Sequence, residues 1–280
     1  IVPKIHLIRY ADDFIVTAKD RETIETVILP LVRNFMTERG LTLSEEKTKI
    51  THISEGFDFL GFNIRKFPNN TLLTQPSGNA KKRFCDKIRK VIESNKTAKQ
   101  HSLIKMLNPI ITGWGNYYKY GTSAETFHRV DWEIHRKLWQ WARRRHSNKS
   151  KGWIKDKYFK TVNGRKWRFV ADMEERSKMR QITLAYLPDI HHEKFAKVRH
   201  YANLYDPADK SYYEWRETYR MKQTLKGRES LVRIWKRQNR TCPFCGERID
   251  RERPWSITES IIGGKKDYKL IHTSCKAKMS

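Results

Sequence analysis

Two acidic residues stand side by side near the start of the chain, between two apolar runs. Residues 5–16 read IHLIRYADDFIV, and this pattern predicts a β-hairpin with Asp12 and Asp13 at its tip. Adjacent carboxylates suit Mg²⁺, which proteins hold through a few carboxylates together with substrate phosphates. A two-metal site of this kind stabilises the attacking and leaving oxygens of phosphoryl transfer. An isolated Asp-Asp pair is also common in solvated turns, so the pair alone leaves both interpretations open.

A second set of residues with metal chemistry lies in the last 39 residues. Cys242 and Cys245 form one C-x2-C pair, and His272 and Cys275 repeat the spacing further on. Three thiolates and one imidazole can close a tetrahedral structural Zn²⁺ site. The alternative is a set of reduced, unpaired thiols. Cys85 stands apart from these four, and we expect it to be a small core residue.

The charge of the chain points to a polyanionic partner. The 280 residues carry 58 Lys and Arg against 31 Asp and Glu, a formal net charge of +27. Nucleic acids present dense phosphate charge, and Lys and Arg contacts release their condensed counterions. No apolar run approaches the roughly 20 residues that span a bilayer, and no signal peptide is evident. We therefore expect a nucleic-acid partner, no membrane, and a reducing location, either the cytoplasm of a prokaryote or an organelle.

Two stretches concentrate the positive charge. Residues 81–105 hold nine Lys or Arg and two acids, and residues 136–168 hold 13 against the single acid Asp156. Such stretches can follow an RNA backbone, although a solvated helix face is the alternative. Aromatic residues in this region, including Trp114, share an apolar stripe and are more consistent with core packing. The candidate RNA contacts are Lys82, Arg83, Arg89, Lys90, Arg143, Arg144 and Arg145.

The elements that must position these residues alternate between short strands and helices. Residues 21–39 have helical spacing, which Pro30 is expected to kink or shorten. Short strands are expected at 41–43, 49–53, 57–60 and 62–66, and residues 67–79 have the composition of a linker.

A helical period begins at Ala80. A second stripe covers 103–107, Asn108-Pro109 fits the start of a further helix, and another helix is expected at 130–144. The fold class is therefore α+β, with antiparallel hairpins, a helical lobe and a small zinc-bound tail.

Several segments resemble group II intron-encoded reverse transcriptases, in the order of that family. IRYADDFIV (8–16) resembles the catalytic hairpin and GLTLSEEKTKI (40–50) the segment that follows it. FDFLGFNIRK (57–66) resembles the primer-grip hairpin. LNPIITGWGNYYKY (107–120) resembles the maturase signature, and KGWIKDKYF (151–159) fits the downstream pattern.

The resemblance implies roles for particular residues. Asp12 and Asp13 would hold Mg²⁺, and Lys47 would assist the leaving pyrophosphate unless it is a solvated surface lysine. Phe59, Leu60 and Gly61 would position the primer end. The implied partners are intron RNA, an RNA template and primer, a DNA target and dNTPs. No segment matches the fingers or the other palm aspartate, so we expect upstream sequence, or a separate upstream polypeptide, to supply them.

The tail also resembles HNH endonuclease domains, in Trp255, Gly263-Gly264 and the zinc pairs. The catalytic positions differ, because Ser256–Ser260 stands in place of a His pair, Asp267 in place of Asn, and Lys276 in place of a later His. Without a histidine base, water is hard to activate. We expect a degenerate, zinc-stabilised DNA-binding element with little or no cleavage.

The resemblance divides the chain into five parts. They are the end of a palm (1–66), a linker (67–79), a thumb/maturase domain (80–170), a maturase extension or DNA-binding region (171–235) and the degenerate HNH-like tail (236–280). The expected function is RNA-directed DNA polymerisation together with assistance to intron splicing. The alternative is an RNA-binding splicing cofactor that does not polymerise.

Overall fold

A computed structural model describes residues 5–175, 178–192, 198–199, 201–225, 228–250, 253–262 and 265–278. The chain forms two compact units, residues 1–192 and residues 193–280, which are described separately below. Among the described residues, none of the helices has the length and apolar character needed to cross a membrane.

The first unit opens with the predicted hairpin. Strand β1 (His6–Tyr10) pairs antiparallel with β2 (Asp13–Thr17), and Tyr10 lies opposite Asp13. The turn therefore consists of Ala11 and Asp12, and Ala11 adopts the left-handed region with φ of 52°. A non-glycine residue there is uncommon and costs conformational energy.

A single run of helical turns follows the hairpin, as α1 (Arg21–Thr23), a π-helical segment (Ile24–Ile28) and α2 (Leu29–Thr37). Pro30 does not end the helix. It lies in the first turn of α2, directly after the π-helical segment. Proline is tolerated at this position, because a backbone N–H in the first turn is not needed for the α-helical hydrogen bonds.

A three-stranded sheet, β3-β4-β5, links this part to the helices. It contains β3 (Phe57–Phe59), β4 (Phe62–Lys66) and β5 (Leu72–Pro76). The strands expected at 41–43 and 49–53 are absent, because the backbone folds into local turns such as the one closed by Thr48 N–H on the Ser44 carbonyl. The expected linker at 67–79 was also wrong in part. Pro68, Asn69 and Asn70 mark a turn, but Leu72–Pro76 pairs with β4, and Gly78 and Asn79 begin α3.

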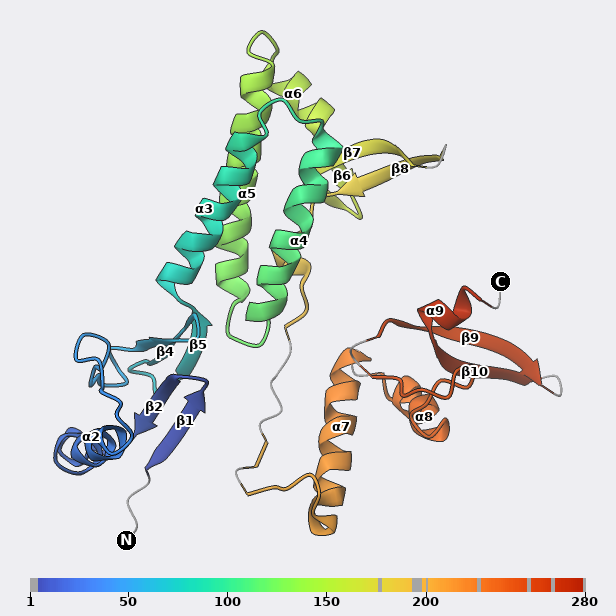
Figure 1. The fold of residues 1–280 in the computed structure, drawn as a ribbon. Coiled ribbons are helices and arrows are strands. Elements are labelled where there is room, and N and C mark those ends of the chain that lie inside the picture. The colour runs from blue at the N-terminus through green and yellow to red at the C-terminus, as the bar shows by residue number, and fades with distance from the viewer. Residues whose placement is uncertain are drawn as a thin grey trace. The chain divides into compact units, whose positions relative to one another are not determined.

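Three long helices lie side by side in the next part of the unit, α3 (Gly78–Ser94), α4 (Gln100–Tyr118) and α5 (Ala124–Arg145), followed by the short α6 (Lys151–Tyr158) (Figure 1). Their facing stripes form one core. The most deeply buried members include Ile88, Leu103, Ile104, Leu107, Ile111, Phe127, Ile134 and Leu138.

The predicted break at Asn108-Pro109 does not occur, because α4 runs through it. A proline inside a helix leaves the carbonyl four residues earlier without its donor, and that residue, Lys105, is exposed to water. Asn108 is not an N-cap. Its side-chain amide donates to the Thr183 carbonyl and accepts from the Ala185 backbone N–H, at 3.1 and 2.8 Å.

A second three-stranded sheet packs against α4. It consists of β6 (Phe159–Val162), β7 (Arg165–Glu175) and β8 (Lys178–Thr183), and a 3-10 turn (Leu187–Asp189) follows it. Strand β7 runs through the boundary expected at residue 170. The helical lobe therefore continues to His192, because the sheet and the 3-10 turn share its core.

The second unit contains a 3-10 turn (Pro207–Asp209), α7 (Lys210–Thr224), α8 (Glu229–Arg237), β9 (Trp255–Ile262), β10 (Lys265–His272) and α9 (Thr273–Lys276). Strands β9 and β10 form an antiparallel hairpin. Met221 of α7 and Trp235 of α8 share a core with Cys242, Leu270 and Cys275. The boundary expected at residue 235 thus falls inside one compact unit.

Candidate polymerase, RNA-binding and zinc sites

The carboxylate pair lies on the exposed tip of the β1–β2 hairpin. Asp12 occupies the turn and Asp13 begins β2, and both are exposed. Neither carboxylate has a hydrogen bond or ion pair with another described residue. Two adjacent carboxylates without partners supply hard oxygen ligands of the kind that Mg²⁺ takes, but they are only part of a coordination shell.

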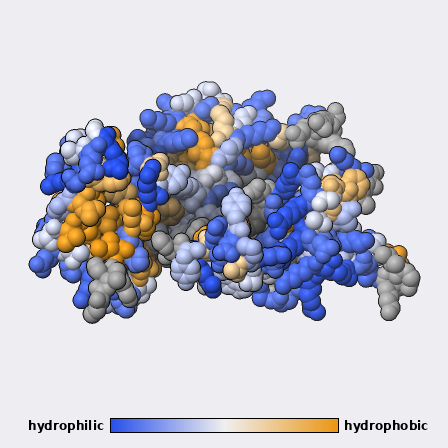
Figure 2. Space-filling model, turned by 60° about the horizontal axis from the view of Figure 1, so that its bottom comes forward, coloured by the Kyte–Doolittle hydropathy of each residue, from blue (hydrophilic) through white to orange (hydrophobic). Residues whose placement is uncertain are grey.

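The surface around this hairpin is apolar. Leu7, Ile8 and Tyr10 on β1 are more than half exposed, as are Leu31 and Phe35 on the neighbouring helix. Figure 2 shows the resulting patch as the large hydrophobic area on the lobe at the left. An isolated two-stranded hairpin is marginally stable in water, and large apolar patches mark interaction sites. The hairpin therefore presents a face suited to packing against further protein.

Lys47 lies in the turn that follows Ser44 and is exposed. No contact joins it to Asp12 or Asp13 within the described residues. Its role at the leaving pyrophosphate is therefore part of the proposal below.

The expected primer-grip residues are anchored to the helical lobe. Leu60 and Gly61 form the β3–β4 turn with φ of 49° and 78°. The Tyr117 hydroxyl of α4 donates to the Leu60 carbonyl at 2.8 Å, and the Ser77 N–H donates to the Gly61 carbonyl at 2.8 Å. A Cβ on Gly61 would lie 2.6 Å from the Tyr118 hydroxyl, so the turn and α4 fit closely. Phe59 is half-buried at the end of β3.

The aromatic residues of the maturase-like segment are mainly structural, as predicted. Tyr118 is buried, and burial raises the pKa of its hydroxyl. Trp114 stacks on Phe84 with ring centroids 4.5 Å apart. Tyr117 is half exposed and stacks on Phe62 of β4. These rings join the sheet and the helices into one body.

The candidate RNA-binding residues fall on two helices. Those of α3 and the C-terminal turn of α5 are all exposed, and Arg89 forms an ion pair with Asp86 of the same helix. Arg145 differs from the others. Its guanidinium donates to the Lys96 and Ala98 carbonyls at 2.7 and 2.9 Å and stacks on Trp141. Arg145 therefore ties α5 to the α3–α4 loop, while Lys82, Arg83, Lys90, Arg143 and Arg144 remain outward-facing.

A further stripe on α5 was not predicted from the sequence. Trp132 is 61% exposed, with Arg129 one turn before it and the Arg136 guanidinium 5.5 Å from its ring centroid. Spacings of three and four place these residues on the face opposite the core residues Ile134 and Leu138. The repeat was readable in the sequence, but exposure of Trp132 was not.

The zinc-ligand prediction has a clear geometric counterpart in the second unit. One ligand atom from each of Cys242, Cys245, His272 and Cys275 lies within 4.8 Å of all the others. Cys245 Sγ is 3.3 Å from His272 Nδ1. A tetrahedral site with bonds of about 2.1–2.3 Å holds its ligand atoms within about 4 Å of one another, so the donor set and its spacing fit Zn²⁺ after a small contraction.

Backbone groups lower the pKa of one of these residues, Cys242, and orient the ring of another, His272. Burial raises the pKa of the Cys242 thiol, but N–H groups of His272, Cys245 and Phe244 donate to its sulfur and lower the pKa to about 6 overall. Gly246 closes the turn of the first pair with φ of 72°, and its N–H donates to the Cys242 carbonyl. His272 Nε2 lies 3.1 Å from the Arg248 carbonyl, which orients the ring so that Nδ1 faces the cysteines.

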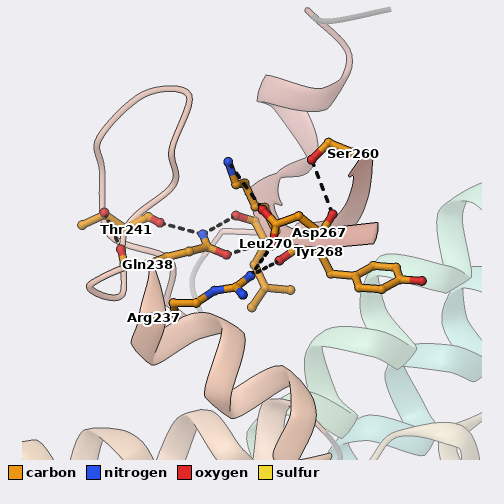
Figure 3. Close-up of polar contacts among 8 residues, drawn as sticks. Arg237, Gln238, Thr241, Ser260, Asp267, Tyr268 and Leu270 are labelled. Atoms are coloured by element: carbon orange, nitrogen blue, oxygen red, sulfur yellow. Dashed lines mark hydrogen bonds and ion pairs between the residues drawn. The ribbon is translucent and has the colours of Figure 1, made fainter. Parts of the chain in front are cut away.

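Polar side chains at the C-terminal end of α8 form hydrogen bonds with Thr241 and with strand β10 (Figure 3). The Gln238 amide donates to the carbonyls of Thr241 and Leu270 and accepts from the Leu270 N–H. It thereby ties the segment before Cys242 to the strand that ends at His272. Arg237 forms an ion pair with Asp267 at 2.6 Å and also donates to the Tyr268 carbonyl.

The positions that differ from HNH endonucleases have structural contacts. Asp267 lies inside β10 and is engaged by Arg237. The 256–260 segment is strand, and Lys276 Nζ donates to the Ile257 carbonyl at 3.3 Å. Gly263 and Gly264 lie outside the described residues. Cys85 is half-buried against the lobe core, where burial raises its thiol pKa.

Comparison with known proteins adds two family matches and two relatives. Residues 2–64 match the model described as reverse transcriptase (RNA-dependent DNA polymerase), and residues 81–159 match that of the group II intron, maturase-specific domain. Two curated proteins of Lactococcus lactis subsp. cremoris, one from strain MG1363, are both described as group II intron-encoded protein LtrA. Each is 37% identical over 105 residues, covering 33% of this chain and 17% of the relative. The chain thus spans about a sixth of the length of these relatives.

Proposed function

Because this chain belongs to the group II intron reverse transcriptase/maturase family, we propose that it acts in a protein that copies RNA into DNA and holds intron RNA during splicing. One observation carries this proposal. The reverse transcriptase segment and the maturase segment are consecutive, and the Tyr117–Leu60 hydrogen bond joins them. The β3–β4 turn is thereby fixed to the helical lobe that carries the maturase segment.

The polymerase role is assigned to the hairpin tip. Asp12 and Asp13 would hold Mg²⁺, which supplies charge stabilisation to a transferring phosphoryl group. Phe59, Leu60 and Gly61 would position a primer end, and Lys47 would face the leaving pyrophosphate. The fixed turn at Leu60 and Gly61 supports positioning, because its backbone is held from two sides.

Further palm strands and fingers, on the same or another polypeptide, are proposed to complete the polymerase. The support is the apolar surface around Leu7, Ile8 and Leu31. Burying such a face against protein contributes about 25 cal/mol for each Å² of apolar area removed from water. In this arrangement β1 and its neighbouring helix become internal.

The helical lobe is proposed to bind intron RNA through α3 and α5. Its outward cations include Lys82, Arg83 and Lys90 on α3 and Arg143 on α5. Trp132 adds an exposed ring on which an unpaired base can stack, an interaction worth about 1–3 kcal/mol. RNA catalyses the splicing, and the protein supplies binding and support.

Replacing Trp132 with Ala tests this interface. The variant should bind a group II intron RNA about 5- to 150-fold more weakly, because about 1–3 kcal/mol of stacking is lost. Its melting temperature should be unchanged, since the ring makes no core contact. Trp114→Ala is the matched control, expected to lower stability instead. Unchanged RNA affinity of the Trp132 variant would remove the ring from the interface.

The second unit is proposed to be a zinc-stabilised DNA-binding element with little or no cleavage activity. Zinc would be held by Cys242, Cys245, His272 and Cys275, and it would stabilise the fold. The support against cleavage is that Asp267 and Lys276 have structural partners. A plasmid-nicking assay with added Mg²⁺ or Mn²⁺ checks this, and robust cutting that depends on residues 236–280 would contradict it.

A further inference from the structure

A basic hollow lies beside the zinc cluster in the second unit. It has a volume of about 530 Å³ and is lined by Lys236, Asn239, Arg240, Thr241 and Arg248. Three of the five lining residues are cations and none is acidic. The hollow belongs neither to the zinc cluster nor to the hairpin tip.

The shape of the hollow comes from the chain reversal after α8. Asn239 and Arg240 adopt left-handed backbone conformations with φ of 52° and 64°. The Arg240 N–H donates to the Trp235 carbonyl, which ends the helix, and the Arg240 guanidinium lies 5.5 Å from the Trp235 ring centroid. Two consecutive non-glycine residues in this region are costly, and together they reverse the chain between the end of α8 and Thr241.

The positive charge of the hollow is only partly compensated. Glu217 of α7 pairs with both Arg240, at 2.7 Å, and Arg248, at 2.8 Å. Lys236 is exposed and has no ion-pair partner among the described residues. Three cations against the ion-paired carboxylate of Glu217, with a weaker electrostatic interaction between Lys236 and Glu229, leave an excess of positive charge in the hollow. The side chains of Asn239 and Thr241 add neutral hydrogen-bonding groups.

Two residues that line the hollow, Thr241 and Arg248, are connected to the four-residue cluster of Cys242, Cys245, His272 and Cys275. Thr241 precedes the ligand Cys242, and Thr241 pairs with Arg248 in an isolated β-bridge. The Arg248 carbonyl lies 3.1 Å from Nε2 of the ligand His272. Metal binding at the four ligands therefore fixes the backbone that carries two hollow residues, without the metal lining the hollow.

We propose that this hollow binds a phosphodiester of a nucleic-acid backbone, with Lys236 and Arg248 as the principal contacts. This proposal rests on the proposed nucleic-acid function and deepens it by naming a site. A phosphate offers several acceptor oxygens, which match lysine and arginine donors and the amide of Asn239. Contacts to a phosphate carry no base sequence, so binding here is sequence-independent.

The test uses the full chain loaded with zinc and compares two double variants. Lys236→Gln with Arg248→Gln removes the proposed contacts. Lys210→Gln with Arg233→Gln removes the same charge from exposed positions of this unit that do not line the hollow. Fluorescence anisotropy then measures binding to a labelled 20-base-pair DNA duplex and to a labelled RNA of equal length over a range of salt concentrations.

The hollow variant should bind at least one of the two ligands several-fold more weakly. The slope of log affinity against log salt concentration should fall by about one for each phosphate that the variant no longer neutralises. The control variant should keep both the wild-type slope and the wild-type affinity within about twofold. The ligand whose affinity falls identifies the source of the phosphate. Equal effects of the two variants on both ligands, at unchanged melting temperature, would overturn the proposal.

The outcome is separable from that of the proposed function. A chain that binds intron RNA with dependence on Trp132 but shows no hollow-specific slope change keeps the proposed function and loses this site. A hollow-specific slope change without any preference for intron RNA supports the site and contradicts the proposed function. A melting curve of each variant guards against unfolding, and Arg240 is left intact because it contacts Trp235.

Discussion

Replacing glycine with alanine is expected to have opposite effects on stability at two positions of α4, Gly115 and Gly113. A Cβ on Gly115 would lie 2.1 Å from Ile190 Cδ1 and 3.0 Å from Leu187 Cδ2. A Cβ on Gly113, two residues earlier, would meet nothing within 4 Å. The first position lies where α4 packs against the 3-10 turn at Leu187–Asp189, and the second faces solvent.

The magnitudes follow from two opposing contributions. Replacing glycine by alanine within a helix stabilises by about 1 kcal/mol through the backbone. Overpacking costs about 1–3 kcal/mol, since carbon atoms prefer separations near 3.5–4.0 Å. The terminal methyl of Ile190 can rotate away, but fully buried Leu187 cannot easily follow. We therefore expect Gly115→Ala to be about 1–3 kcal/mol less stable than Gly113→Ala.

Thermal unfolding followed by circular dichroism measures this difference. For a unit of this size 1 kcal/mol corresponds to about 2–4 °C, so the two melting temperatures should differ by several degrees. Ile190→Val removes Cδ1 and should restore part of the stability of Gly115→Ala. Equal melting temperatures for the two alanine variants, or no rescue by Ile190→Val, would refute the packing of α4 on this turn.

Three other predictions concern charge and metal. Arg145→Gln should destabilise the lobe by about 1–2 kcal/mol in urea unfolding, because two hydrogen bonds to carbonyls of the α3–α4 loop are lost. Arg144→Gln, at the exposed neighbouring position, should leave the stability unchanged. Equal effects of the two substitutions would contradict the role of Arg145 in holding this loop. Burial raises the pKa of Asp131 to about 6, so between about pH 4 and 6 the unfolded chain loses this proton while the folded chain keeps it, and stability falls as pH rises. Asp131→Asn should therefore raise the free energy of unfolding by up to about 3 kcal/mol at about pH 7.5 and by less at about pH 5; the same gain at both pH values would exclude this cause. Removing zinc with a chelator should lower the melting temperature of the second unit. Cys242→Ser should abolish that response and reduce the zinc content measured by mass spectrometry. A melting temperature that does not change with the chelator would contradict a structural metal.

Local patterns in the sequence predicted the elements with strong periodicity. The hairpin around Asp12 and Asp13 followed from apolar runs on either side of a polar pair, and α3 followed from a stripe of Phe84, Ile88 and Ile92. The closeness of Cys242, Cys245, His272 and Cys275 could be predicted from their spacing, because two such pairs are typical of one four-ligand metal site.

Tertiary contacts decided the elements that were predicted wrongly. Asn108-Pro109 looked like a helix start, yet Asn108 is held by the backbone near Thr183, 75 residues away in sequence. Strand β5 lay hidden in a segment with turn composition, since its pairing with β4 is not a local property. The exposure of Trp132 and the hollow lined by Arg248 depend on how the elements pack against one another. A short sequence pattern does not contain this information.

One chain thus joins the carboxylate pair of a reverse transcriptase segment to a maturase lobe proposed to bind RNA. The sharpest experiment replaces Asp12 and Asp13 with Ala in a polypeptide that carries the complete polymerase domain, and then measures cDNA synthesis and intron splicing in parallel. Synthesis should disappear while splicing continues, because α3 and α5 are untouched. Retained synthesis, or loss of both activities in a normally folded variant, would contradict the proposed division of roles.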